Sequence, residues 1–355
     1  MTESTVPSGA PTRYDLGRDD LHSWLAGEPR FRVEQLWHGL YGELAEPDEL
    51  TTLPKTLRAR LAAELPAALT LVTEQTSDAG DTVKFLWLLD GGARIETVLM
   101  LYPDRATVCV SSQAGCAMAC GFCATGQAGF ERHLGVGEIV EQVVRASRRA
   151  RTLGRRVSNV VFMGMGEPLA NEERVWTAIE RLHNALGLSA RHLTISTVGV
   201  VPGIRHLASR PLPVNLAVSL HAANDKLRDS LVPLNRRYPL AVLLEACQQY
   251  LDARNRRLSF EWALIDGVND RDRDADELAR LCLRLRPAAH VNLIPLNPTP
   301  GSTALGSSMV RVRAFRDDLQ TRGVNATIRR NRGTDIDAAC GQLAAGYPVS
   351  LRTGR

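Results

Sequence analysis

The run Cys109-Val-Ser-Ser-Gln-Ala-Gly-Cys-Ala-Met-Ala-Cys-Gly-Phe-Cys123 holds four of the seven cysteines of this 355-residue chain. Cys116, Cys120 and Cys123 follow a C-x3-C-x2-C spacing, which can bring three thiolates onto one metal centre. A [4Fe-4S] cluster held entirely by protein takes four thiolates. Three therefore leave one iron open, and the sequence predicts a cluster that binds a substrate or cofactor through that iron.

Zinc, a disulfide pair and buried structural cysteines are the alternatives. Structural zinc sites usually show a second C-x2-C or Cys/His pair at a finger-like distance, and the downstream sequence offers neither. An odd number of cysteines in a chain without a secretion signal fits reduced thiols better than a disulfide scaffold.

Composition describes an ordinary globular chain, with 44% hydrophobic and 23% charged residues. We see no apolar run near the ~20 residues of a membrane span and no signal peptide at the N-terminus, so we expect a cytoplasmic protein that does not bind membranes. A net charge of +4 is compatible with a polyanionic partner without indicating one. Arginine carries nearly all the positive charge, which suits phosphate recognition but also follows from a GC-rich genome.

Apolar, strand-length runs alternate with amphipathic, helix-length stretches from Thr107 onward. Six β-then-α units predict a parallel sheet with helical crossovers, and six rather than eight favours a partial (βα)6 barrel of the α/β class. The expected strands begin at Thr107, Asn159, Leu193, Val214, Leu258 and His290.

The remaining chain divides by pattern into flanking segments. Apolar residues at helical spacing predict a small helical accessory domain, which either contacts RNA or only packs against the main domain. Turn signals at Asp78 and Asp90 predict a short β extension. We expect a disordered tail over 1–15, the helical domain over 16–70, the β extension over 71–105, the barrel over 106–345 and a C-terminal tail over 346–355.

Polar or glycine-bearing residues follow most of the expected strands, where parallel α/β sheets place their reactive groups. Gly164-Met-Gly-Glu-Pro follows the second strand, and it is not a dinucleotide fingerprint because Leu169 stands where a third glycine is required. Glu167 is therefore expected to accept hydrogen bonds from an ammonium group. His221 after the fourth strand is a further candidate ligand.

Six segments together resemble the RlmN/Cfr group of radical S-adenosylmethionine (SAM) RNA methyltransferases, over about residues 20 to 345. They are Cys109-Val-Ser-Ser-Gln-Ala-Gly-Cys, the three cluster cysteines, Met163-Gly-Met-Gly-Glu-Pro-Leu-Ala-Asn, Ser219-Leu-His-Ala, Val291-Asn-Leu-Ile-Pro-Leu-Asn-Pro and Asp335-Ile-Asp-Ala-Ala-Cys-Gly-Gln-Leu. The last segment is more similar to the RlmN branch than to the Cfr branch.

The resemblance implies a role for each matching residue. It implies cluster ligation by Cys116, Cys120 and Cys123, methyl transfer through Cys340, resolution by Cys109 and proton acceptance by Glu96. For SAM it implies contacts from Gly166, Glu167, Ser196, Ser219, Leu220, His221 and Asn297.

The resemblance also implies a radical route to C2 of an adenine, a carbon too electron-poor to attack SAM directly. Two SAM molecules are used per turnover. Cys340 first becomes S-methylcysteine, and a 5′-deoxyadenosyl radical then takes hydrogen from its methyl group. The resulting radical adds to the adenine, and a thiol at Cys109 resolves the covalent protein–RNA adduct, leaving a disulfide.

The substrates implied are 23S ribosomal RNA, in its peptidyl-transferase region, and the anticodon arm of transfer RNAs. The resemblance also implies an external flavodoxin- or ferredoxin-type electron donor and a monomer. A Cfr-like adenine-C8 methyltransferase that confers ribosomal antibiotic resistance is the alternative. An RNA-binding protein with a structural cluster is the third possibility, and an open iron would serve no purpose in it.

Overall fold

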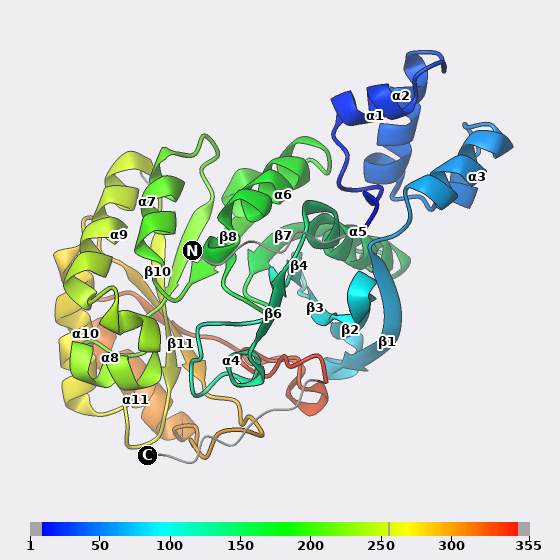
Figure 1. The fold of residues 1–355 in the computed structure, drawn as a ribbon. Helices are drawn as coiled ribbons and strands as arrows, with labels where there is room; N and C mark the ends of the chain where they lie inside the picture. Colours follow the sequence, from blue (N-terminus) through cyan, green and yellow to red (C-terminus); the bar gives the residue numbers. More distant parts are fainter. Residues whose placement is uncertain (1–8, 255, 347–355) are drawn as a thin grey trace.

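A ten-stranded sheet organises the computed structural model, which describes residues 9–254 and 256–346 (Figure 1). The order in the sheet is β1-β2-β3-β4-β7-β8-β9-β10-β11-β12, and every neighbouring pair from β4 onward is parallel. Strand bounds are β1 Leu69–Ser77, β2 Thr82–Leu89, β3 Arg94–Leu101, β4 Ala106–Cys109, β7 Val157–Phe162, β8 Leu193–Thr197, β9 Asn215–Ser219, β10 Leu258–Leu264, β11 His290–Pro295 and β12 Ala326–Ile328.

A helix follows each of the six predicted strands, which confirms the expected α/β architecture with six βα units. These helices are α5 Val136–Thr152, α6 Glu172–Asn184, α7 Val201–Ser209, α9 Leu240–Arg254, α10 Asp272–Arg284 and α11 Met309–Thr321. The order of the sheet is linear, so the barrel is open. β12, a seventh parallel strand, was not predicted because three residues are too few to show a hydrophobic period.

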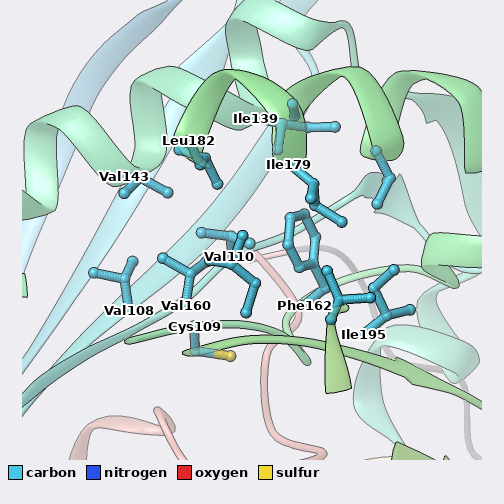
Figure 2. Close-up of a cluster of buried hydrophobic side chains, with 14 of the residues drawn as sticks. Val108, Cys109, Val110, Ile139, Val143, Val160, Phe162, Ile179, Leu182 and Ile195 are labelled. Carbon is cyan, nitrogen blue, oxygen red and sulfur yellow. The ribbon is translucent and has the colours of Figure 1, made fainter. Parts of the chain in front are cut away.

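Alternation along the strands separates a helix-covered face from a reactive face. Val108 and Val110 point toward α5 and α6 together with Phe162, whereas Cys109 between them points to the opposite side, toward the C-terminal segment (Figure 2). Side chains two residues apart in a strand share a face. The helices therefore bury one face of the sheet and leave the other for chemistry.

The predicted β extension is antiparallel and continues the barrel sheet without a break. Turns over Asp78–Gly80 and Asp90–Gly92 join β1 to β2 and β2 to β3, as the turn residues indicated. β3 then pairs with β4, with Val98 opposite Cys109. The extension therefore shares its hydrogen bonds with the first strand of the barrel.

Short helices precede this sheet, as the apolar spacing predicted. They are α1 Arg18–Trp24, α2 Phe31–Trp37 and α3 Lys55–Glu64, with a π-helical turn over His38–Glu43 and a 3-10 turn over Pro47–Glu49. Elsewhere lie a small ribbon of β5 Gln113–Gly115 with β6 Phe130–His133, and the short helices α4 Ala124–Ala128 and α8 Asp225–Leu231. No helix in the described ranges combines the length and the apolar character that a bilayer crossing requires.

The expectation of a disordered tail over 1–15 is wrong for its last residues. Tyr14 is buried and lies edge-on to Tyr41, with ring centroids 5.5 Å apart. Arg13 pairs with Glu46 at 2.7 Å, and Asp15 accepts the N–H of Gly137 at 2.7 Å. The burial of one aromatic ring and these ionic contacts order a stretch whose composition indicated disorder. Residues 1–8 and 347–355, which make up most of both expected tails, lie outside the described residues.

Candidate functional site

One cavity, at the carboxyl ends of the parallel strands, collects most of the predicted site residues. Its wall includes Cys109, Cys116, Cys120, Cys123, Gly166, Glu167, Ser196, Ser219, His221, Asn297 and Cys340. Of the predicted set, Leu220 and Glu96 are absent from this wall.

The three-cysteine loop runs from β5 to α4 and is held by a close backbone approach. Cys116 donates its N–H to the carbonyl of Gly129 at 2.6 Å. A Cβ on Gly115, whose φ is +71°, would lie 2.0 Å from the same carbonyl oxygen. Glycine is therefore required at this turn, which aims the following cysteines into the cavity.

Burial raises the pKa of the Cys116 thiol to about 12 and raises that of Cys120 as well, and the charge of Cys123 adds to both. Thiolates crowded in this way need a positively charged partner. No three His, Cys, Asp or Glu side chains within the described ranges gather closely enough for a single metal ion. By the chemistry of the donor set, three thiols fit a cubane, because each iron of a [4Fe-4S] cluster takes a separate thiolate.

Glu167 stands beside this loop as a buried carboxylate. Its two oxygens accept backbone N–H groups from Leu169 at 3.0 Å and Val198 at 2.8 Å. Burial raises its pKa to about 7, although these hydrogen bonds oppose the rise. Each carboxylate oxygen can accept a second hydrogen bond, so Glu167 keeps capacity for an ammonium group.

Gly166 is required for this arrangement, because its φ is +95° and a Cβ there would lie 2.5 Å from Cβ of Gln113. The side chain of Gln113 in turn accepts the N–H of Glu167 at 2.8 Å. The Gly-Glu pair is therefore fixed against β5, at the start of the cysteine loop.

His221 links the end of β9 to the cysteine loop. Its Nδ1 accepts the N–H of Ala263 at 3.0 Å, and its ring meets Phe122 edge-on at 4.7 Å. Burial lowers its pKa to about 3. A neutral imidazole that accepts at Nδ1 carries its proton on Nε2, so His221 is a hydrogen-bond donor at the cavity wall.

Arg228 was not predicted, yet it connects the loops that carry the expected SAM contacts. It is 1% exposed and donates to the carbonyl oxygens of Val198 at 2.6 Å, Leu220 at 3.1 Å and Ser219 at 3.3 Å. Leu220 itself is fully buried, and its backbone N–H is bound to the carbonyl of Glu261. Leu220 is thus placed behind the wall rather than on it.

Cys109 and Cys340 share the cavity although they are far apart in the sequence. Cys340 is exposed on the C-terminal segment, and its carbonyl accepts the Nδ2–H of Asn297 at 3.1 Å. Cys109 is buried, which raises its pKa to about 12, and the neighbouring charge of Cys340 contributes to the rise while Arg329 opposes it. Both thiols are free, so the disulfide expected during turnover is not formed in this structure.

Glu96 lies on β3, but its side chain is not part of the cavity wall and makes other contacts. It forms an ion pair with Lys84 and accepts two N–H groups from the C-terminal segment, at Ala344 and Ala345. The structure therefore brings Glu96 to the segment that carries Cys340 and does not open it to the cavity.

Four further charged residues at the wall, Glu261, Arg329, Arg330 and Arg332, were missed by the sequence analysis. Arg329 lies between Met163 Sδ, at 3.4 Å, and a carboxylate oxygen of Glu261, at 3.6 Å. Glu261 is 3% exposed, and this oxygen has no hydrogen-bond partner. Arg329 follows the three-residue strand β12 and Glu261 lies within β10, and neither belongs to a recognisable motif, so no local pattern indicated them.

A family model relates this chain to radical SAM enzymes, and named relatives relate it to RNA methyltransferases. Residues 110–279 match the family model described as the radical SAM superfamily. The "Probable dual-specificity RNA methyltransferase RlmN" of Chloroflexus aurantiacus is 52% identical, with 94% of this chain and 91% of that protein aligned. The protein of the same name from Mycolicibacterium paratuberculosis is 51% identical, with 95% and 96% aligned.

A solved structure, that of a radical SAM methyltransferase from Sphaerobacter thermophilus, has the same fold. It superimposes with a TM-score of 0.92 at 52% identity and covers 94% of this chain and 99% of its own. About half of the aligned residues are thus identical, over almost the whole length of this chain. On this basis, the chain belongs to the RlmN family of radical SAM methyltransferases.

Proposed function

We propose that this protein is a radical SAM RNA methyltransferase that adds a methyl group to C2 of an adenine, in 23S ribosomal RNA and in transfer RNAs. The observation that carries the proposal is the meeting of Cys109 and Cys340 in the cavity of the three-cysteine loop. A structural cluster has no use for a second pair of thiols at its open side. The relatives' names support RNA as substrate and favour the RlmN branch over a Cfr-like C8 enzyme.

Membership in the superfamily implies a [4Fe-4S] cluster and SAM, which together supply a 5′-deoxyadenosyl radical when bound. Cys116, Cys120 and Cys123 would hold the cluster. Gly166 and Glu167 would receive the amino group of SAM, and the wall residues Ser196, Ser219, His221 and Asn297 would complete its contacts. Leu220 would contribute by fixing the backbone between Ser219 and His221.

In this proposal Cys340, Cys109 and Glu96 carry out methyl transfer, release of the RNA and removal of the C2 proton. Cys340, exposed on its segment, carries the methyl group and bonds to the adenine. Cys109 attacks the sulfur of Cys340 and releases the RNA, a step that requires its thiolate. The S–S bond forms as the bond between the Cys340 sulfur and the methylene carbon breaks. Burial raises the pKa of Cys109 to about 12, so its thiol proton leaves during the attack and balances the proton that the methylene carbon takes up to become the methyl group. Glu96 accepts the proton from C2.

The helical domain over 16–70 is proposed as an accessory contact for RNA, and the cell compartment as the cytoplasm. Reduction of the cluster would come from a separate donor protein of flavodoxin or ferredoxin type. We further propose that the chain acts as a monomer.

Nucleoside mass spectrometry tests the proposal directly. Anaerobically reconstituted protein, given SAM, a reductant and unmodified 23S RNA, should yield 5′-deoxyadenosine and 2-methyladenosine, and Cys116→Ala should yield neither. Formation of 8-methyladenosine would instead establish the Cfr-like alternative. Absence of SAM cleavage by the wild-type protein would contradict both.

A further inference from the structure

Lys84 is exceptional in a chain that has only three lysines, at positions 55, 84 and 226. Lys55 and Lys226 are exposed, whereas Lys84 is 7% exposed. Its Nζ lies 3.0 Å from Oε1 of Glu96, which is itself 5% exposed. Burying an ammonium group is costly unless an opposite charge meets it. Lys84 therefore does not serve as a solvated surface charge, and its role is to be sought in the contact with Glu96.

The register of the sheet places this pair beside the reactive thiol. Lys84 on β2 lies opposite Val98 on β3, and Val98 lies opposite Cys109 on β4. Directly opposed residues of antiparallel strands share a face, so these three side chains form one row. Glu96 lies two residues before Val98, on the same face and about 7 Å along the strand.

The free side of Glu96 is closed by the segment that carries Cys340. Its Oε2 accepts the N–H of Ala344 at 2.9 Å and that of Ala345 at 3.0 Å, while Oε1 faces Lys84. Residues of this segment form part of the cavity wall up to Leu343, and the two amides that bind Glu96 come next. The Cys340 segment is thus fastened to β3 immediately after it leaves the cavity.

Other contacts hold the segment around its two ends. Before Cys340, Gly333 donates its N–H to Asp78 at 3.0 Å, and Ser77 bonds to Asp335. Next to Cys340, the carbonyl of Gly341 accepts the N–H of Ala124 at 2.7 Å. Among these hydrogen bonds to the Cys340 segment, those accepted by Glu96 involve the residue proposed as the proton acceptor.

We infer that Lys84 and Glu96 form a buried clasp that positions the Cys340 segment, and that Glu96 is freed to accept a proton only when this segment lifts. The role of Glu96 in proton transfer rests on the proposed function; the clasp itself does not. Lys84 is a positioning residue, because it holds one carboxylate oxygen and directs the other at the two amides. Lifting the segment leaves the ion pair in place and uncovers Oε2 on the reactive face. Movement of the methyl-carrying thiol and exposure of the base are then one event.

Hydrogen exchange of the cluster-loaded, full-length protein tests the clasp without RNA or SAM. Lys84→Met should speed exchange of the Ala344 and Ala345 amides by about tenfold or more, because the Glu96 carboxylate loses the partner that directs its Oε2 at the two amides. A hydrogen bond to a charged group is worth about that factor in an opening equilibrium. Amides in the centres of β2 and β3 should keep their rates. Lys55→Met, the same substitution at an exposed site, should match wild type throughout, and Lys84→Arg should restore most of the protection.

Two outcomes overturn the inference. Exchange at Ala344 and Ala345 that stays at the Lys55→Met rate would show that Lys84 does not fasten the segment. An equal rise in β2, β3 and the segment would show a general stabilising role only.

A double variant, Lys84→Met with Glu96→Leu, covers the case in which the single change unfolds the protein. Replacing both charges of a buried pair by apolar groups is usually tolerated, and this variant should still release Ala344 and Ala345 selectively. Unchanged exchange there would equally refute the clasp. Because the readout needs no turnover, failure of methylation and failure of the clasp are separate results.

Discussion

Replacing Arg228 by methionine should destabilise the protein and weaken SAM binding at the same time. The guanidinium is 1% exposed and bonds to Asn235 Oδ1 at 2.8 Å besides the three carbonyls at the ends of β8 and β9. Burial lowers its pKa to about 10, so the group is still charged at neutral pH. Methionine fills part of the volume but donates nothing, so these acceptors lose a buried partner.

The expected loss follows from that count of contacts. A hydrogen bond from a charged donor contributes roughly 1.5 to 3 kcal/mol, and four such contacts are broken. Relief of the cost of burying the guanidinium offsets part of the sum. Removing one partner of a buried charged network usually costs about 3 to 5 kcal/mol, and we expect a free energy of unfolding reduced by that amount.

Denaturant titration and calorimetry of the cluster-loaded protein measure the two effects. The matched control is Arg236→Met, an exposed arginine beside Asn235. Because the released carbonyls belong to Val198, Ser219 and Leu220, at or next to the cavity wall, SAM affinity should fall at least about tenfold, equivalent to about 1.4 kcal/mol. If Arg228→Met stays within about 1 kcal/mol of the control and binds SAM equally well, the bracing role of Arg228 is wrong.

Three further outcomes are expected. Cys120→Ala should prevent assembly of a full [4Fe-4S] cluster, seen as loss of its visible absorption and of iron content, while circular dichroism stays that of the folded protein. Gly166→Ala should reduce SAM affinity about tenfold or more in calorimetry, because the added Cβ would meet Gln113 at 2.5 Å and the φ of +95° is strained for alanine. Burial raises the pKa of Cys282 from 9.0 to about 12, so the folded state favours the neutral thiol. The stability contributed by this group is therefore present below pH 9 and lost between pH 9 and about 12. Cys282→Ala should flatten the fall in the free energy of unfolding over that pH range.

Most helices and strands of the fold could be predicted from the sequence, because each follows a local hydrophobic pattern. Strands such as Asn215–Ser219 and helices such as Glu172–Asn184 lie within a few residues of their predicted bounds. Apolar spacing reports which face of an element is buried, and that is a property of neighbours in the sequence. Where the pattern was too short, as at β12, or misleading, as at Tyr14, the prediction missed.

Candidate site residues could be predicted from the local sequence only where they lie just after the end of a strand. The three-cysteine loop, Glu167 and His221 belong to this group. Arg228 and Glu261 do not, since an arginine on a short helix and a glutamate within a strand are normally solvated side chains. Their burial depends on what packs over them.

From the amino-acid sequence alone follow a candidate metal-binding loop, six βα units and, through resemblance, a candidate pair of thiols. The three-dimensional fold was needed to show that Leu220 lies behind the cavity, that Arg228 binds three carbonyl groups beside it, and that Glu96 accepts two N–H groups of the Cys340 segment. A short-range pattern records only the period of a helix or strand. A contact between β3 and a segment more than two hundred residues later leaves no period, and forms only when the sheet brings the two together.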